Sequence, residues 1–308
     1  MLIVNEFLAK VPFDLYELSL FHLVVTHRSF TKAAELAGLT QSAITRQMQG
    51  MENSLGIDLL ERTTRSVRVT QAGEFLFRES ARLLGDVDQS LRRLKEDFAN
   101  AKKEIRIGVS RTITPTYLPG LFHANLRRGF EVSYRVTNQP SADILLALEA
   151  NELDLGVICP PIRLPKTLTV THRFADGFAL IAAGETAAGF HSSKTRAARM
   201  NWLKRQPWLL IEETTNTGRE LRAWMTRFGL KVEPAMQLDS FDLIITLVSL
   251  GLGVSIVPIR SLALHGQKKH LMRLPLPDRF ERELVVLMRR HRKQPEHLRN
   301  FVENILFG

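Results

Sequence analysis

Apolar residues recur at helical spacing along the first third of the chain and predict a series of helices. Residues 15–27 carry apolar side chains on one side, and Asp14 is suited to cap the helix start. A second, short helix can begin at Ser29 or Thr31, and its small residues permit close packing. Gly38 is placed to end it with a left-handed backbone.

From Thr40 to Gly56 the pattern predicts a third helix with two distinct faces. Its apolar stripe consists of Ile44, Met48, Met51 and Leu55. The opposite face carries no acid over its first two turns and consists of Gln41, Ser42, Thr45, Arg46 and Gln49. Arg, Gln, Ser and Thr are the residue types that read base edges in the major groove. The tight Gly-Leu-Thr connection therefore predicts either a polar surface hairpin of two helices or a helix-turn-helix whose second helix reads DNA.

The residues after this helix predict a small β-hairpin. A Leu pair at 59–60 is followed by the alternating segment SVRVT, and three arginines stand within seven residues: Arg62, Arg65 and Arg68. Arginines and hydroxyl groups on such a wing can contact phosphates. By themselves they also fit a solvated strand face. Beside the polar-faced helix they complete a winged helix-turn-helix.

Residues 71–101 predict one long helix. Apolar residues follow one another at spacings of three and four, apart from a polar Ser80, and form a heptad seam of Phe77, Leu84, Val87, Leu91, Leu94 and Phe98. A helix packed on its own domain is the alternative. The charges around the seam favour an exposed helix that pairs with a second copy of the chain.

Beyond residue 101 strands and helices alternate, which predicts a parallel α/β sheet. The expected strands are 105–110, 131–136, 153–158, 177–183, 208–212, 232–238, 253–258 and 282–290. A turn and a helix are expected at 111–129, and further helices at 141–151, 218–229, 241–251 and 296–306.

The segment LYELSLFHLVVTHRSFTKAAELAGLTQSAITRQMQGMENSLGIDLLERTTRSVRVTQAG resembles the N-terminal domain of the LysR-type transcriptional regulators. The resemblance rests on SFTKAAELAGLTQSAITRQM, MENSLGIDLLERTTRSV and TQAG, which stand in the family's order and spacing. Three positions depart from the family's usual residues: Ser42, Thr45 and Leu60. The first two lie on the reading face, so they bear on the operator sequence rather than on the family.

The resemblance implies roles for particular residues. Gln41, Ser42, Thr45 and Arg46 match base-facing positions, while Thr31 and Arg62 match positions near phosphates and Arg65 and Arg68 lie in or beside the wing. It also implies that the long helix dimerises the protein, so that two recognition helices meet an inverted repeat in double-stranded DNA. A homodimer or homotetramer is expected, with RNA polymerase as a further partner.

The C-terminal part resembles the effector-binding domain of the same family, most closely in LEANELDLGVI and LVSLGLGVSIVP. This implies two lobes, like those of periplasmic solute-binding proteins, and an α+β multidomain protein. The expected boundaries are 1–70 for the winged helix-turn-helix, 71–101 for the linker helix and 102–308 for the effector domain. Within it, lobe I is expected at about 102–175 and 274–308, and lobe II at about 176–273.

Ligands of open α/β sheets bind beyond the carboxyl ends of strands, where helix starts favour anions. The candidate effector-binding residues are Ser110, Arg111, Thr112, Asn138, Ser141, Thr214, Thr215 and Phe241. For each hydroxyl residue the alternative is a simple helix cap.

Charge supports an anionic small-molecule effector more than it supports DNA binding. The net charge is +10, but residues 1–100 hold 12 basic and 13 acidic residues, which leaves 30 and 19 for residues 101–308. The DNA-binding interpretation therefore rests on local placement of side chains and not on net charge. The basic segments 191–205 and 289–293 contribute much of the excess and also fit ordinary solvated surface.

The remaining composition argues against other classes of protein. No HExxH or CxxC spacing and no phosphate-binding glycine loop occurs, so we expect no enzyme, no metal and no cofactor. Cys159 is the single cysteine, so a disulfide within one chain is excluded and a reducing, cytoplasmic location is expected. No membrane span or signal peptide is predicted. A ligand-responsive transcription factor explains both halves. An architectural DNA-binding protein would explain only the first, and a solute-binding transport component only the second.

Overall fold

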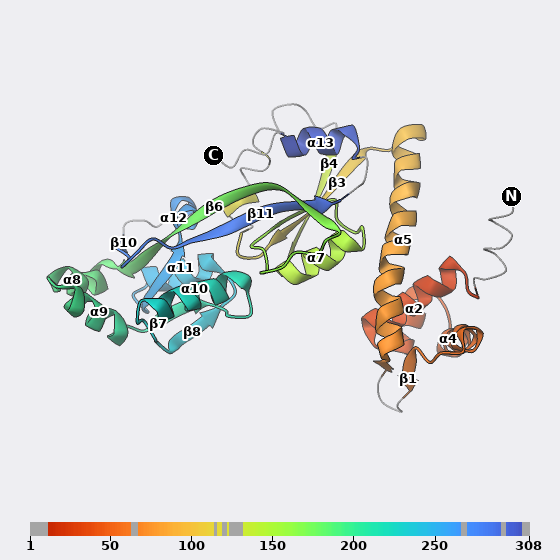
Figure 1. Cartoon of the computed structure of the whole chain (residues 1–308), viewed down its shortest axis with the longest axis horizontal. Coiled ribbons are helices and arrows are strands. Elements are labelled where there is room, and N and C mark those ends of the chain that lie inside the picture. Colours follow the sequence, from red (N-terminus) through yellow and green to blue (C-terminus); the bar gives the residue numbers. More distant parts are fainter. Residues whose placement is uncertain are drawn as a thin grey trace. The chain divides into compact units, whose positions relative to one another are not determined.

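The structure is a computed structural model, and its two compact units, residues 1–101 and 102–308, are described separately (Figure 1). The residues that it describes are 12–62, 67–113, 116–118, 122, 132–265, 270–290 and 294–303.

The first unit is a winged helix-turn-helix followed by a long helix. Its elements are α2 (Leu15–His27), α3 (Phe30–Ala37), α4 (Gln41–Leu55), β1 (Leu60–Arg62), β2 (Val67–Val69) and α5 (Gln71–Phe98). The expected caps are confirmed. Asp14 forms a capping box with Glu17, Ser29 caps α3, Thr40 caps α4, and Gly38 and Gly56 end their helices in the left-handed region. The expected linker helix ends at Phe98, a few residues before residue 101.

The wing is fixed to the helices by buried contacts. The Glu52 carboxylate, only 8% exposed, accepts the backbone N–H groups of Leu59 and Leu60, each at 2.9 Å. At the start of α5, Gly73 lies so close to the chain that an added Cβ would stand 2.1 Å from the Leu59 carbonyl oxygen. These contacts set the position of β1 and β2 relative to α4.

The second unit contains two lobes built on one continuous sheet. Among the described residues the sheet has nine strands, in the order β4-β3-β5-β11-β6-β9-β7-β8, with β10 paired to β6. Lobe I holds β3 (Lys103–Ser110), β4 (Val132–Gln139), α7 (Ser141–Glu149), β5 (Leu155–Ile158) and α13 (Glu296–Glu303). Helices α7 and α13 cover opposite faces of its strands (Figure 1). Residues 111–129, expected as a turn and a helix, lie largely outside the described residues.

Lobe II is formed by the middle of the chain around a core of its own. It holds α8 (Gly184–Ser192), α9 (Arg196–Arg205), β7 (Trp208–Ile211), α10 (Asn216–Arg227), β8 (Pro234–Leu238), α11 (Phe241–Ser249), β9 (Val254–Pro258), α12 (Ile259–Leu264) and β10 (Leu271–Leu274). Helix α9 occupies part of the basic segment 191–205, to which the sequence analysis assigned no element.

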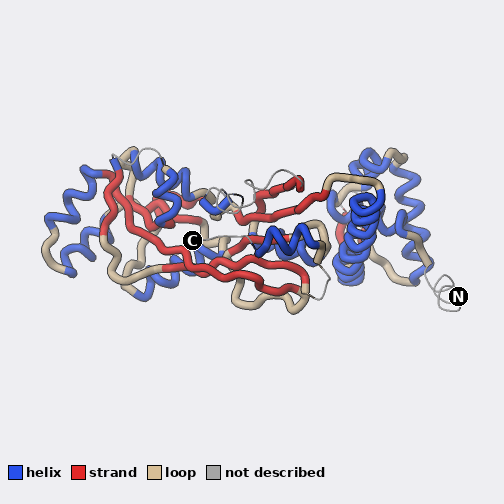
Figure 2. Tube along the Cα trace, turned by 90° about the horizontal axis from the view of Figure 1, so that it is seen from above, coloured by secondary structure: helices blue, strands red, loops and turns tan. Residues whose placement is uncertain are grey.

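Two long strands, β6 (Leu168–Ala183) and β11 (Glu281–Arg289), correct the expectation of a purely parallel sheet. Pairing is parallel within each lobe, between β3 and its neighbours and between β7 and its neighbours. However, β6 is antiparallel to β9, β10 and β11, and β11 is antiparallel to β5. The first half of β6 pairs with β11 and the second half with β9 and β10, so this strand runs from one lobe into the other (Figures 1 and 2). Because β11 returns alongside β6 from lobe II, the two strands must point in opposite directions.

Candidate functional site

Helix α4 presents an open polar face opposite a buried apolar one. Ile44 and Met48 are at most 1% exposed in the unit's core, and Met51 joins them. The five residues expected to face DNA lie on the other side: Gln41, Ser42, Arg46 and Gln49 are exposed and Thr45 is half-buried.

Local hydrogen bonds engage only the small hydroxyl groups of this face. The Thr45 hydroxyl donates to the Gln41 carbonyl at 2.8 Å, and the Ser42 hydroxyl lies 3.1 Å from that of Thr40. Within the described part of the chain, the guanidinium of Arg46 has no ion-pair partner. Its donors are therefore available to a ligand.

The wing places further groups at the edge of the same unit. Glu61 of β1 pairs with Arg68 of β2, which is exposed. Thr31, on α3, is exposed as well. Arg65 lies outside the described residues, and the side chain of Arg62 is not described.

The expected seam on α5 is divided, which corrects the idea of one continuous contact surface. Phe77 and Leu84 pack against the unit's own core, and the Phe77 ring stacks on His22 with ring centres 4.1 Å apart. The first turns of α5 lie against α2, and this side of the helix is therefore used within the chain. The remaining four residues are exposed: Val87 38%, Leu91 54%, Leu94 56% and Phe98 82%.

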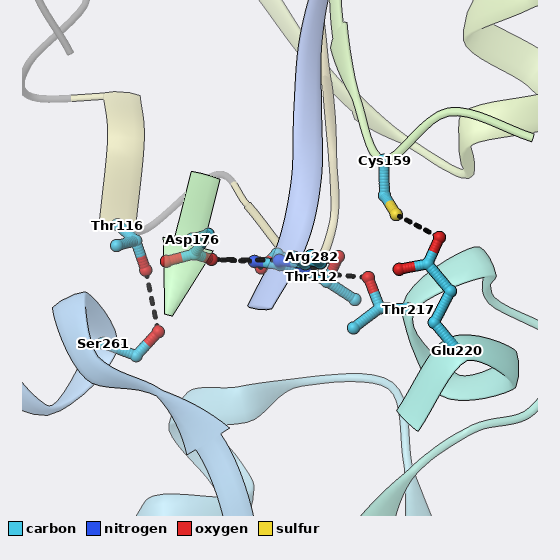
Figure 3. A network of polar contacts seen from close by, with 8 residues as sticks. All are labelled: Thr112, Thr116, Cys159, Asp176, Thr217, Glu220, Ser261 and Arg282. Carbon is cyan, nitrogen blue, oxygen red and sulfur yellow. Dashed lines mark hydrogen bonds and ion pairs between the residues drawn. The ribbon is translucent and has the colours of Figure 1, made fainter. Parts of the chain in front are cut away.

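In the second unit, the centre of the junction between the lobes is Arg282, which no sequence pattern had singled out (Figure 3). Its side chain is fully buried, and its Nε and Nη2 groups both contact Asp176 Oδ2, at 2.9 and 2.8 Å. Nη1 donates to the hydroxyls of Thr112 (3.1 Å) and Thr217 (2.8 Å), and Nη2 also donates to the Thr112 carbonyl. We call these four residues the Arg282 clasp.

The clasp joins four elements of the two lobes. Arg282 and Asp176 are direct cross-strand partners on β11 and β6, Thr112 follows β3 of lobe I, and Thr217 lies in the first turn of α10 in lobe II. The guanidinium carbon also stands 5.3 and 5.6 Å from the ring centres of Phe178 and Phe241. Four hydrogen bonds and the ion pair with Asp176 together hold the guanidinium.

Other contacts cross the junction nearby. The hydroxyls of Thr116 and Ser261 are 2.9 Å apart, and the Asn216 amide donates to the Cys159 carbonyl at 2.7 Å (first pair in Figure 3). The Cys159 thiol is buried 3.8 Å from the Glu220 carboxylate. Burial, with that carboxylate adding to it, raises the pKa of Cys159 to about 11, so the thiol is protonated at neutral pH.

The structure brings only some of the expected effector residues to this junction. Thr112 and Phe241 belong to the surroundings of Arg282, and Arg111 lies 3.7 Å from Asp239, with both side chains about half exposed. Thr215 caps α10, as the alternative of a simple helix cap proposes.

The contacts described for the other expected effector residues are local. Thr214 bonds to Glu212, and the Ser141 hydroxyl donates to that of Ser110 at 3.3 Å. Asn138 is exposed at the end of β4. These residues therefore remain candidates.

One signal in the sequence could have pointed to Arg282. Arg282 and Leu284 of β11 and Phe280 just before it alternate onto one buried face, while Glu281 and Glu283 are exposed. A charged residue on the buried face of a strand needs a partner. That partner, Asp176, is identifiable only once β6 and β11 are known to pair.

Among the described residues, no group of three or more His, Cys, Asp or Glu side chains is arranged to hold a metal ion. No helix within the described ranges is long and apolar enough to span a bilayer.

A winged helix-turn-helix with an exposed polar face on its second helix, joined to a two-lobed α/β domain, is typical of ligand-responsive DNA-binding regulators. Residues 15–74 match the family model for bacterial regulatory helix-turn-helix proteins of the lysR family, and residues 99–306 match the LysR substrate binding domain. The chain belongs to the LysR family of transcriptional regulators, and it is a transcriptional regulator of that type.

Known transcriptional regulators are similar to this chain over most of its length. The RuBisCO operon transcriptional regulator of Allochromatium vinosum is 28% identical over 284 residues, which cover 88% of this chain and 89% of that protein. The HTH-type transcriptional regulator BenM of Acinetobacter baylyi is 28% identical over 272 residues, 86% of each chain. The crystal structure of CbnR, a LysR family transcriptional regulator, shares the fold with a TM-score of 0.67 at 20% identity, over 95% of this chain and 98% of that one. These family members are named as transcriptional regulators.

Proposed function

We propose that this regulator binds an inverted-repeat operator as a dimer or tetramer and reads it with helix α4. The observation that carries the proposal is the exposed face of Gln41, Ser42, Thr45, Arg46 and Gln49, whose longer side chains are not engaged within the described chain. Arg46 would read a guanine edge, since a guanidinium can make two hydrogen bonds to guanine. Thr31, Arg62, Arg65 and Arg68 would contact the phosphate backbone and fix the register.

The structure of CbnR bound to its target DNA, 21% identical to this chain with a TM-score of 0.65, shares the fold and gives this proposal a precedent. We propose that Val87, Leu91, Leu94 and Phe98 form the contact between copies, because they are the exposed part of the apolar seam on α5. Two copies would present two recognition helices to half-sites separated by whole helical turns. A regulator that binds chromosomal DNA would be located in the cytoplasm. We propose no catalytic activity for it.

The test is selection of random duplex DNA by the purified full-length protein. We expect an enriched inverted repeat, and we expect Arg46→Ala to lose one or more specified positions. Arg82→Ala, which removes an exposed arginine of α5 paired with Glu79, is the matched control and should select the same repeat. Tight, salt-sensitive binding without any enriched sequence would point instead to an architectural protein.

We further propose that a small anionic effector, such as a carboxylate, binds at the junction of the lobes. The excess of basic residues in 101–308 supports an anion, and Arg111 is the accessible guanidinium at the end of β3. Ser110, Thr112, Asn138, Ser141, Thr214, Thr215 and Phe241 remain the other candidates. The effector would act by binding one lobe arrangement more tightly than another and so shifting their populations.

This part is tested by a thermal-shift screen of small carboxylates and matched amines, followed by footprinting on the selected operator. We expect carboxylates to stabilise the protein and to change the footprint, and Arg111→Gln to weaken both effects. Stabilisation by neutral amines but not by carboxylates would contradict the anionic assignment.

A further inference from the structure

A separate hollow lies in lobe II, away from the Arg282 clasp. It is formed by helices α8 and α9 and the connection after β10, and its volume is about 300 Å³. Its lining residues are Phe190, Arg196, Arg199, Met200, Leu203 and the segment 275–277. This volume is at the lower end of the roughly 300–1,000 Å³ typical of small-molecule pockets.

The floor of the hollow is apolar and firmly placed. Phe190 and Leu203 are 2% and 3% exposed and belong to the core of lobe II, against which Met200 and Leu276 also pack. The apolar body of a ligand would therefore meet a preformed surface rather than a mobile one.

The rim carries two cations, neither of which has an acidic partner among the described residues. Arg199 is oriented by its Nε–H, which donates to the Ser193 carbonyl at 3.0 Å, and by the Phe190 ring, whose centre lies 5.2 Å from the guanidinium carbon. Arg196 is exposed, and neither arginine has an ion pair with any described carboxylate. Oriented guanidinium groups bind carboxylates in charge-assisted pairs.

The surroundings reinforce this positive charge. Residues 191–205 contain five basic residues and no acidic one. A second hollow shares Pro275 and Leu276 with the first, and its charged lining residues are Arg273, Arg279 and one acid, Asp278. Arg279 is paired with Glu281, whereas Arg273 is exposed. An anion approaching α9 thus meets little local repulsion.

We propose that the hollow between α8, α9 and residues 275–277 is a second ligand site, which binds a small amphipathic carboxylate. The carboxylate contacts Arg196 and Arg199, and a compact apolar body lies on Phe190, Met200 and Leu203. A phosphate of DNA would use the arginines but would gain nothing from the apolar floor, so the floor favours a molecule with both parts. The site is independent of the proposed DNA contacts and of the proposed effector site.

The test uses the full-length protein with ¹³C-labelled methionine methyl groups, titrated with hexanoate. The chain has eight methionines, and the Met200 signal is assigned by Met200→Leu. We expect a saturable shift of Met200, while Met236 and Met272, which do not line the hollow, stay unchanged. The neutral isostere hexanamide should bind at least about tenfold more weakly, because it lacks the charge that pairs with the arginines.

Two matched double variants separate the site from general charge. Arg196→Gln with Arg199→Gln should weaken hexanoate binding about tenfold or more. Lys204→Gln with Arg205→Gln removes the same charge from the same helix outside the hollow and should change binding little. Equal weakening by both pairs, or a Met200 signal that does not respond to hexanoate, would overturn the proposal. A response to non-operator duplex DNA but not to hexanoate would instead assign this face to DNA backbone contact.

Discussion

Replacing Arg282 by methionine removes the guanidinium of the clasp and keeps a long apolar side chain in its place. The loss leaves the Asp176 carboxylate, 1% exposed in its side chain, without the cation that contacts its Oδ2 at 2.8 Å. It also removes the hydrogen-bond donors from the hydroxyls of Thr112 and Thr217. Removing one partner of a buried ion pair lowers the free energy of unfolding by about 3–5 kcal/mol. Since a domain is stable by only about 5–15 kcal/mol, the effector domain should be strongly destabilised.

The appropriate assay is hydrogen exchange of the full-length protein, because two units need not unfold in one transition. Amides of β6 and β11 should exchange about a hundredfold faster or more in the variant, as a loss of about 3 kcal/mol implies. Amides of α2 and α4 belong to the other unit and serve as an internal reference.

A second variant distinguishes the ion pair from simple packing. Replacing Asp176 by leucine in the Arg282→Met background removes both charges, and this should recover much of the lost protection, since a buried pair can be replaced by apolar residues at little cost. If the single variant exchanges like the wild type, or if the double variant is as unprotected as the single one, the clasp does not stabilise the junction as argued.

Four further predictions concern other parts of the chain. Arg46→Ala should lower discrimination between operator and random DNA by about 1–3 kcal/mol in competition binding. An equal loss of affinity for operator and random DNA would contradict a base-reading role for Arg46. Leu91→Asp with Leu94→Asp should yield monomers by light scattering, and a variant that stays oligomeric would place the contact elsewhere. Burial lowers the pKa of His22, although its hydrogen bond to the Phe77 backbone carbonyl opposes this shift. The folded protein therefore disfavours the charged imidazole. The stability of the first unit should consequently fall as the pH drops below about 6.5, where His22 of the unfolded chain becomes protonated. His22→Asn should flatten that dependence, and an unchanged slope would contradict it. Cys159 should resist iodoacetamide in the native state, because the thiol is buried and its pKa is about 11; modification as fast as in the unfolded chain would contradict this.

The first unit could be derived largely from its sequence because its determinants are local. Caps such as Asp14 and Thr40 act within a few residues, and the stripe of α4 is read from helical periodicity alone. The polar face of α4 follows from the same periodicity. What periodicity could not show is how far α5 stays in contact with its own core, which depends on the packing of Phe77 against His22.

The second unit shows the limit of this approach. Many strands and helices within each lobe follow the alternation of the sequence, which predicts an α/β sheet, whereas the division into two lobes was expected only from the resemblance to the LysR family. The antiparallel return of β11 along β6 was not, because the residues that pair are more than a hundred positions apart. That pairing alone brings Arg282 opposite Asp176 and carries both to Thr112 and Thr217. Local spacing thus determined many of the elements and the polar face of α4, while long-range pairing decided which charges are buried together between the lobes.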